Sequence, residues 1–325
     1  MDAVESVMLS IRGFDFTNDY EALMWLENGI HGGNVSVEEL RERDASRVPG
    51  LAWGRLVAVW DWQIVGAIEA QQKPDPFQGR SEVRVGVRPD HRGLGIGTAL
   101  VTALETALRD AGGDTMLAFT DELEMGYNHF LWRVGFAESA RGYPQWLALP
   151  GYDLERFSVN WDAIREAGLE FRSLSEVRFE WDCAQKLYDL YCTVERDVPR
   201  VDDWYIPKPF DEFCADIFDS PSSLPDGVML AVRVHDWGME YVGCNILYLD
   251  SGGRVLHNGL TGVRREARGL GLALALKLKG IEFARNNGFD GIKSYNASTN
   301  DAILKLNTKL GFQRQSAILE WRKRI

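Results

Sequence analysis

The sequence predicts two tandem α/β (α+β) domains, each a mixed, largely antiparallel sheet flanked by helices on both faces. Three observations indicate this architecture. The chain has 325 residues, about the length of two domains. Residues 86–101 and 262–277 are identical at nine of sixteen positions, at an offset of 176 residues. Each half also shows a run of strands, then a helix, a strand, a helix and a last strand.

A second marker keeps the same offset between the two halves. A Gly-Phe pair at 135–136 lies 43 residues after Arg92, and another at 311–312 lies 43 residues after Arg268. The repeat therefore predicts an N-terminal domain at 1–150, a linker at 151–167 and a C-terminal domain at 168–325.

In the first half, the apolar pattern predicts an opening strand at Val7–Ile11 and a helix over 20–30. Ser36 begins a capping box, Ser-Val-Glu-Glu, and predicts the start of a second helix. Two strands joined at Asp61-Trp62 are expected to form a hairpin. The remaining elements are these two strands at 51–60 and 63–70, a strand at 82–88, a helix over 96–107, a strand at 115–120, a helix ending at Gly135 and a strand at 144–149.

The second half repeats this order. Its predicted strands lie at 169–173, 228–235, 240–249, 255–263, 291–295 and 316–322, and its predicted helices at 178–196, 209–218, 271–286 and 300–310.

Composition and charge exclude several classes of function. The net charge of −12 argues against a nucleic-acid partner, which needs a basic surface, and suits a cationic amine substrate. No apolar stretch reaches the length of a membrane span and no signal core follows Met1, so a cytoplasmic chain without a membrane partner is expected.

The histidines are scattered, so no metal site is expected. Without a C-x-x-C pair, the four cysteines are expected to be buried free thiols: Cys183, Cys192, Cys214 and Cys244.

A glycine-rich turn occupies the same strand-to-helix junction in both halves. It reads R-G-L-G-I-G at 92–97 and R-G-L-G-L-A at 268–273. Glycines leave backbone N–H groups open at a helix N-terminus, which predicts a pyrophosphate cradle. The spacing G-x-G-x-G is not the dinucleotide fingerprint, and no G-K-[ST] follows as in a Walker motif.

At these residues the chain resembles the GNAT superfamily of N-acetyltransferases, whose signature is [Q/R]-x-x-G-x-[G/A]. Arg92, Gly95 and Gly97 match it in the first copy. The second-copy matches are Arg268, Gly271 and Ala273. The resemblance covers both halves and implies transfer of an acetyl group from acetyl-CoA (CoA) to a small-molecule amine or a peptide. It also implies coenzyme contacts from the fourth strand and the turn, at Val85, Val87, Arg92, Gly93, Gly95, Ile96, Gly97 and Thr98, and at Thr261, Gly262, Val263, Arg268, Gly269, Leu270, Gly271, Leu272 and Ala273.

The resemblance also implies coenzyme contacts from asparagines after the fifth strand, here Asn296, Asn300 and Asn307. The first copy has Thr120, Glu124 and Leu131 instead. The chain thus resembles bacterial tandem GNAT proteins in which one copy is catalytic and the other degenerate or structural. The active site is therefore expected in the C-terminal domain.

For the catalytic base, the resemblance points to the position eleven residues before the motif, which is His257 in the second copy. An imidazole titrates near neutral pH, which suits a base. The first copy has Ser81 there, followed by Glu82, and Glu195 and Asp197 are further candidates. Many GNAT enzymes have an acid tyrosine four residues before the Gly-Phe pair; Leu131 and Asn307 stand there, so no acid is assigned.

Three interpretations remain open. The first is an N-acetyltransferase with its site in the C-terminal copy. The second is a non-catalytic protein that binds acyl-CoA in both copies for regulation. The third gives the N-terminal copy a structural role only. The acceptor is open, and the chain is expected to be a monomer or a homodimer.

Overall fold

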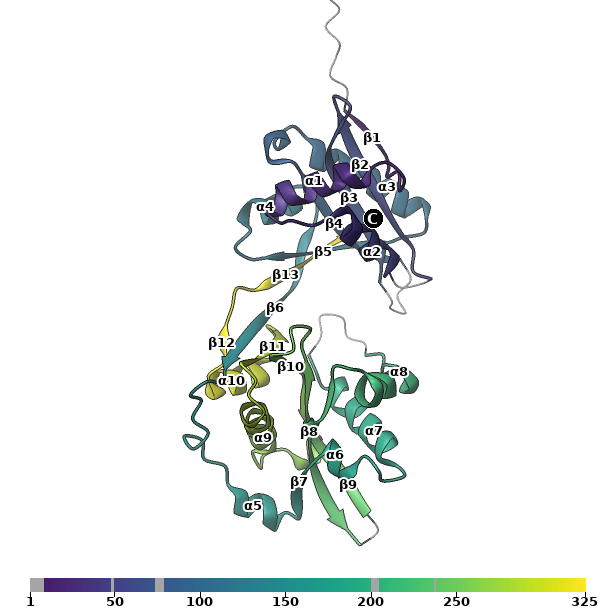
Figure 1. Cartoon of the computed structure of the whole chain (residues 1–325). Coiled ribbons are helices and arrows are strands. Elements are labelled where there is room, and N and C mark those ends of the chain that lie inside the picture. The colour runs from purple at the N-terminus through teal and green to yellow at the C-terminus, as the bar shows by residue number, and fades with distance from the viewer. Residues whose placement is uncertain (1–8, 48–49, 74–78, 200–204, 237) are drawn as a thin grey trace, which may run out of the picture. The chain divides into compact units, whose positions relative to one another are not determined.

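The computed structural model describes residues 9–47, 50–73, 79–199, 205–236 and 238–325 (Figure 1). Contacts divide the chain into two compact units. The first unit contains Met1–Ser139 and Leu319–Ile325, and the second contains Ala140–Ile318. The first residues of the predicted strand Val7–Ile11 lie outside the described residues.

The first unit is built on one mixed sheet. Its strands follow the order β1 (Ser10–Gly13), β2 (Trp53–Trp60), β3 (Gln63–Gln72), β4 (Arg80–Val87), β5 (Thr115–Asp121) and β13 (Ile318–Arg324). Strands β1 to β4 are antiparallel neighbours, and β4 and β5 are parallel. The hairpin between β2 and β3 turns at Asp61 and Trp62, which take positive φ values of 50° and 64°.

Helices cover both faces of this sheet. They are α1 (Tyr20–His31), α2 (Val37–Ala45), α3 (Ile96–Asp110) and α4 (Met125–Arg133). A Cβ added to Gly86 would lie 2.6 Å from Ile30 of α1, whereas one added to Gly66 would lie 3.1 Å from Leu100 of α3. Helix α1 therefore packs on one face of β3 and β4, and helix α3 packs on the other face. The predicted capping box at Ser36 is present, since Glu39 and Ser36 exchange hydrogen bonds.

The second unit has the same plan. Its sheet order is β6 (Ala137–Ala148), β11 (Gly291–Ala297), β10 (Val255–Val263), β9 (Gly238–Leu249), β8 (Ser223–His235) and β7 (Leu169–Ser173), and β12 (Gln313–Arg314) pairs with β6. Strands β10 and β11 are parallel, and the neighbouring pairs are antiparallel.

Its helices are α5 (Trp161–Glu166), α6 (Leu174–Val177), α7 (Cys183–Arg196), α8 (Phe210–Cys214), α9 (Leu272–Asn286) and α10 (Asp301–Leu310). A π-helical turn, η2 (Ala215–Asp219), continues α8, and the 3₁₀ turns η1 (Pro89–His91) and η3 (Arg265–Ala267) precede the two glycine turns. A Cβ on Gly262 would lie 2.6 Å from Val194 of α7, and one on Gly243 would lie 3.1 Å from Leu276 of α9. The sheet therefore has helices on both faces, as predicted.

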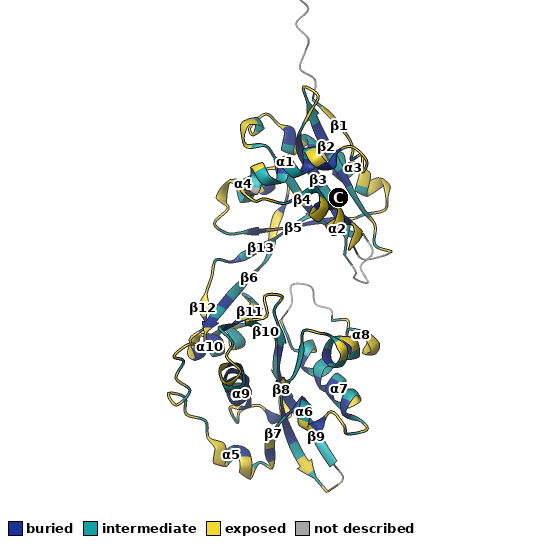
Figure 2. Cartoon of the chain, in the orientation of Figure 1, coloured by how far each residue is buried: buried dark blue, intermediate teal, exposed yellow. Residues whose placement is uncertain are grey.

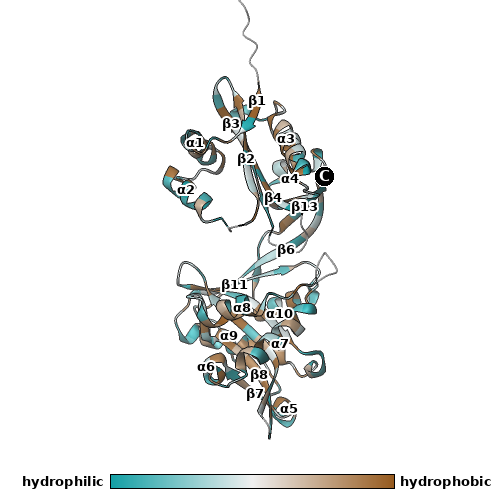
Figure 3. Cartoon of the chain, turned by 90° about the vertical axis from the view of Figure 1, so that its right-hand side faces the viewer, coloured by the Kyte–Doolittle hydropathy of each residue, from teal (hydrophilic) through white to brown (hydrophobic). Residues whose placement is uncertain are grey.

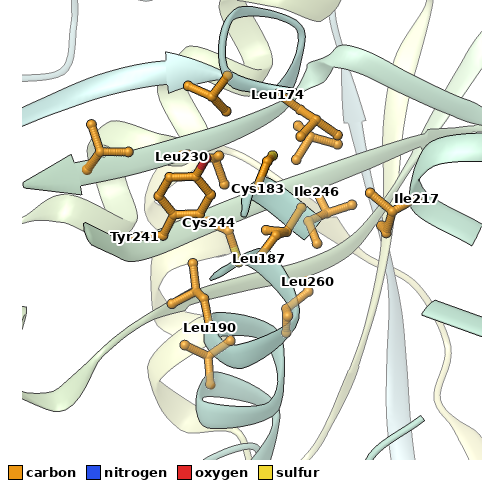
Figure 4. Packing of buried hydrophobic residues seen from close by; sticks show 14 of the residues in the cluster. Leu174, Cys183, Leu187, Leu190, Ile217, Leu230, Tyr241, Cys244, Ile246 and Leu260 are labelled. Carbon is orange, nitrogen blue, oxygen red and sulfur yellow. The ribbon is translucent and has the colours of Figure 1, made fainter. Parts of the chain in front are cut away.

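Buried residues follow the central strands of each sheet (Figure 2). In the second unit, hydrophobic residues line α9 and β8 (Figure 3). Figure 4 shows part of this unit's core, where Leu187 and Leu190 of α7 pack against strand residues. The thiols of Cys183 and Cys244 are buried there, and Cys192 and Cys214 are half-buried; all four are free.

Each unit is completed by a strand from the other sequence repeat. In the second unit, Gly142–Ala148 of β6 pairs with Ala297–Gly291 of β11. In the first unit, β13 is the neighbour of β5. Residues 140–148 thus fold with the second unit and 319–325 with the first, which differs from the predicted division at 1–150, 151–167 and 168–325. The predicted linker also contains α5.

Candidate functional site

The glycine turn of the first unit leaves its backbone open. Gly93 and Gly95 have φ values of 80° and 81°, and a Cβ at either position would meet nothing within 4 Å. Other residues rarely adopt this backbone conformation, so the turn depends on glycine. Nε of Arg92 donates to the carbonyl oxygen of Val87 at 3.1 Å and fixes the turn against the end of β4.

The turn leads directly into α3, and the first backbone N–H groups of this helix are free to bind a ligand. The first helical bond of α3 runs from the nitrogen of Ala99 to the oxygen of Gly95, at 3.0 Å. The preceding N–H groups of Ile96, Gly97 and Thr98 have no acceptor within the helix, as at any helix start. Ile96 is buried in the core and Thr98 is exposed. An anion at this end of α3 would be bound by backbone groups and by the helix dipole.

The second unit repeats this geometry. Gly269 and Gly271 have φ values of 91° and 76°, again with nothing within 4 Å of an added Cβ. Nε of Arg268 donates to the oxygen of Val263 at 3.0 Å. Helix α9 begins with Ala275 bonded to Gly271 at 3.0 Å. The residues of this turn therefore fit a pyrophosphate group as those of the first turn do.

The side chains around the two turns differ. A Cβ on Gly97 would lie 3.0 Å from the ring of Phe130, whereas the second copy has Ala273 at this position. Leu272 is buried in the core, and Leu270 and Ala273 are half-buried. These predicted site residues can therefore contribute to coenzyme binding mainly through their backbone.

The charges around the two turns differ, because Asp197 places a carboxylate beside the second turn. In the second unit its carboxylate accepts from Nε of Arg265 at 3.0 Å and also pairs with Arg268 of the turn. The hydrogen bond from Arg265, with that from Arg268 and both charges, lowers the pKa of Asp197 to about 2. A carboxylate with so low a pKa and with two guanidinium partners is a poor proton acceptor, which argues against the expectation that Asp197 is a candidate base. Within the described residues, no carboxylate contacts Arg92 in the first unit.

Both sheets open between their two parallel strands. The register pairs Arg80–Glu82 of β4 with Thr115–Leu117 of β5. It pairs Val255–Asn258 of β10 with Gly291–Ser294 of β11. The predicted coenzyme residues of these strands, Val85, Val87, Thr261, Gly262 and Val263, lie beyond the paired parts and before the glycine turns. Strand β10 also has an irregular register between Asn258 and Leu260, opposite β9.

Tyr127 of α4 reaches the opening of the first unit. Its hydroxyl oxygen lies 3.4 Å from the backbone nitrogen of Val85, which donates to it. Burial raises the pKa of Tyr127, while the hydrogen bond from Val85 lowers it by less. In the sequence Tyr127 is an aromatic near the expected acid position, but its spacing assigned it no role. The missed signal is that residues 127 and 131 are one helical turn apart and share a face.

His257, the predicted base, lies on β10 and is exposed. In register it is opposite Tyr248 of β9 and Lys293 of β11. Partial desolvation by these strands, with the charge of Lys293, lowers the pKa of His257, against the opposing charge of Asp250. The ring is therefore neutral at neutral pH. In the first unit, Ser81 at the equivalent position is buried.

The three predicted asparagines are held within the second unit. The amide nitrogen Nδ2 of Asn307 donates to Oε1 of Gln145 at 2.8 Å, and Asn307 is fully buried. Nδ2 of Asn296 donates to the same oxygen at 3.1 Å. The side chain of Asn300 accepts from the nitrogen of Ile303 and caps α10. Asn307 therefore cannot touch a coenzyme in this arrangement, which corrects that expectation, and Asn300 acts first as a helix cap.

The first unit contains a polar pocket of about 350 Å³ between α2 and the ends of β3 and β4. Its lining includes Arg43, Arg47, Glu69, Lys73, Glu82 and Arg84. No helix within the described ranges is long and apolar enough to span a membrane.

Comparisons with known proteins agree with this geometry. Residues 20–136 match the model of the acetyltransferase (GNAT) family. N-acetyltransferase 8 of Rattus norvegicus is 32% identical over 93 residues, which are 28% of this chain and 42% of that protein. The alignment thus spans less than half of that relative.

Two solved structures resemble the whole chain. One is a GCN5-related N-acetyltransferase from Sphaerobacter thermophilus, with a TM-score of 0.68 and 18% identity over 97% of this chain and 95% of that one. The other is a tandem GNAT protein from the clavulanic acid biosynthesis pathway, with a TM-score of 0.59 and 20% identity over 98% of both chains. At these identities the likeness shows the fold, which is that of tandem GNAT proteins.

Proposed function

Because residues 20–136 form a domain of the GNAT acetyltransferase family and the chain has the tandem GNAT fold, we propose that this protein is an acyl-CoA-dependent N-acetyltransferase. It transfers an acetyl group to the amine of a small molecule or peptide. Both glycine turns bind the pyrophosphate of acetyl-CoA, and the reaction takes place in the first unit. The observation that carries this is the pair of left-handed glycines before each long helix, where no side chain fills the space over the backbone donors.

In the first unit, two groups in the strand opening fit the chemistry. When bound, acetyl-CoA supplies an acetyl group activated as a thioester. The N–H of Val85 is a backbone donor suited to the negative charge that develops on an acyl oxygen. The hydroxyl of Tyr127 stays protonated at neutral pH because burial raises its pKa, so it can give a proton to a departing sulfur.

In the second unit, Ile303 stands at the position equivalent to Tyr127. Asn307 stands at the expected acid position and is buried, and Arg268 is bound to Asp197. The asparagines that favoured the C-terminal domain are engaged with Gln145 or cap a helix. These contacts support the first unit as the reaction site.

His257 favours the second unit as the alternative reaction site. It is exposed on β10 and its pKa is lowered, so a neutral imidazole is available to take a proton from an ammonium group. In this version the first unit holds coenzyme without turnover.

Calorimetric titration of acetyl-CoA into the parent protein and the variants Gly95→Asp and Gly271→Asp tests coenzyme binding. Each variant places a carboxylate in one turn and is expected to remove one of two binding sites. Gly112→Asp and Gly288→Asp are matched controls, since these glycines also have positive φ, at 83° and 73°, and open space. Absence of binding to the parent protein, or sites unaffected in both turn variants, would overturn the proposal.

Thiol release from acetyl-CoA with a panel of amines then locates the reaction. Tyr127→Phe is expected to lower the rate about 10²-fold, the usual worth of a positioned proton donor, with coenzyme affinity unchanged. A loss in His257→Ala with full activity in Tyr127→Phe would place the reaction in the second unit instead.

A further inference from the structure

The pocket of about 350 Å³ in the first unit carries an unusual set of charges. Four cationic residues line it, against two carboxylates, in a chain whose net charge is −12. The lining residues are Arg43, Ser46, Arg47, Leu51, Glu69, Gln71, Gln72, Lys73, Glu82 and Arg84. Its volume is in the range of sites for small molecules.

The two carboxylates of the pocket are held ionised. Burial favours the neutral form of Glu69, but the hydrogen bond and charge of Arg55 and the charge of Arg47 lower its pKa below the ordinary value. Glu69 accepts from Arg55 at 2.8 Å and from Arg47 at 2.9 Å. For Glu82, burial is likewise outweighed by Lys73 and Arg84, so its pKa is also lowered. Both groups are therefore negative at neutral pH.

The cations divide into a buried and an exposed set. Arg47 is 10% exposed, and it bonds to Asp44 and Glu69 and lies 4.1 Å from the ring of Trp53. Arg84 is 69% exposed and Arg43 is 41% exposed, each with one ion pair, to Glu82 and Glu27. Because a guanidinium has five N–H donors, Arg84 and Arg43 keep donors for a ligand at the pocket's rim.

The pocket adjoins the strand that carries the reaction. Side chains alternate along β4, so Glu82 and Arg84 lie on the same face as Gly86, which approaches Ile30 of α1. Val85, whose N–H faces Tyr127, is one residue beyond Arg84. A carboxylate bound at Arg84 would lie about one residue, or roughly 3 Å of strand, from the level of that N–H, so the amine of the same ligand can approach it.

We propose that this pocket binds the acceptor, and that the acceptor is an amine that also carries a carboxylate, as a free amino acid does. The carboxylate pairs with Arg84 and Arg43, and the amine nitrogen lies toward the N–H of Val85. A polyamine is disfavoured because four cations surround the space. The proposal rests on the proposed acetyl transfer. In that transfer a nitrogen–carbon bond forms and the carbon–sulfur bond breaks. The ammonium gives one proton to solvent, the sulfur takes a proton from Tyr127, and the second proton that the nitrogen loses returns to Tyr127.

Matched ligands test the proposal. An amino acid, its primary amide and its decarboxylated amine differ only in the carboxylate. We expect the amino acid to give the highest kcat/KM in thiol release, and to bind by calorimetry where the other two do not. In Arg84→Gln, kcat/KM for the amino acid should fall about tenfold, as for loss of a charge-assisted bond, with less than a twofold change for the amide. Arg109→Gln, which removes a 55% exposed arginine of α3, is the matched control and should change neither.

Two outcomes would overturn the proposal. Equal kcat/KM for the amino acid and its amide, with no effect of Arg84→Gln, would show that the pocket does not select a carboxylate, while the acetyl transfer itself stands. Absence of turnover with every amine would reject the acetyl transfer. The calorimetric binding of the amino acid, and its loss in Arg84→Gln, then still decides whether the pocket takes a carboxylate, so the two failures are distinguishable.

Discussion

Oε1 of Gln145 accepts a hydrogen bond of 2.8 Å from Nδ2 of Asn307, a residue that follows it 162 positions later in the chain. Gln145 is 3% exposed and Asn307 is fully buried. Asn296 donates to the same oxygen at 3.1 Å. One carboxamide oxygen of β6 therefore accepts from the amide nitrogens of Asn296 on β11 and Asn307 on α10, and joins β6 to the second unit.

Gln145→Leu should destabilise the second unit. The change leaves the buried donor of Asn307 without its acceptor and weakens the bonding of Asn296, at a cost of about 2–3 kcal/mol in the free energy of unfolding. Urea denaturation measures this. Gln313→Leu, at an exposed position of β12 in the same unit, is the control and should cost little.

The double variant Gln145→Leu/Asn307→Leu separates hydrogen bonding from packing. The first repeat has Leu131 at the position equivalent to Asn307, so a leucine is compatible with this site in the fold. Replacing both partners should restore much of the lost stability. If the double variant loses as much free energy of unfolding as the two single variants together, the hydrogen bond is not the cause of the loss.

Truncation after Ile318 should destabilise the first unit, although the removed residues lie at the other end of the sequence from the rest of that unit. It removes the neighbour of β5, the bond of 2.9 Å from Nε1 of Trp321 to Thr120, and the ion pair of 2.6 Å between Lys323 and Glu105. Trp321→Ala alone should cost about 3–5 kcal/mol, since Trp321 is 7% exposed.

Hydrogen exchange can follow each unit separately in the truncated chain. Peptides from β5 and α3 should lose protection, and peptides from β8 and β9 should keep it. Loss of protection confined to the second unit would contradict the assignment of β13 to the first.

Lys277 makes stability depend on pH. It is 3% exposed within α9, its ammonium group donates to Asn258, and its pocket is lined by apolar and amide side chains without a carboxylate. Burial lowers the pKa of Lys277 from 10.5 to about 7. The unfolded chain then binds one more proton between these pH values, so the free energy of unfolding rises with pH across that window. Below about pH 7 the cost of burying the charge is present in full.

Lys277→Met should remove this dependence. Between pH 7 and pH 9.5, the free energy of unfolding of the parent protein is expected to rise by about 3 kcal/mol more than that of the variant. The slope is about 1.4 kcal/mol per proton and pH unit. Urea denaturation at several pH values measures the difference. Lys279→Met, at a 39% exposed position of the same helix, is the control. Parallel pH profiles for the parent and Lys277→Met would show that Lys277 is charged in the folded state.

Asp197→Asn should strengthen coenzyme binding in the second unit. The carboxylate now pairs with Arg265 and Arg268 beside the glycine turn and repels a phosphate there. Removing one surface charge is expected to be worth about 1 kcal/mol, or roughly fivefold in Kd, and less at high salt. Calorimetry with CoA at two salt concentrations checks this. Asp162→Asn, which removes an exposed partner of Arg165 on α5, should leave Kd unchanged.

Much of the fold could be predicted from the sequence because its signals are local. Apolar spacing predicted α1, α3, α9 and most strands, and the capping box at Ser36 predicted the start of α2. The two glycine turns could be predicted because positive φ values require particular residues at fixed spacing. Helix α5 was missed because six residues are too few to show a helical period.

The site was predictable in part, for the same reason. The turn residues depend on local conformation, and the structure places them at the two helix starts. The side chains around them depend on contacts between distant segments. The hydroxyl of Tyr127 meets Val85 across 42 positions, and Arg268 meets Asp197 across 71. No spacing in the sequence shows these contacts, so Tyr127 was not assigned and Asp197 was offered as a base.

By itself, the sequence determined that one domain plan occurs twice, with a glycine turn before a long helix in each copy. It could not determine which sheet each last strand joins. Residues 142–148 and 318–324 occupy equivalent positions in the repeat, so the repeat alone does not say which sheet each strand joins. Only the packed structure decides between them, because the choice depends on what each strand meets: Gln145 meets Asn307 in the second unit, and Trp321 meets Thr120 in the first.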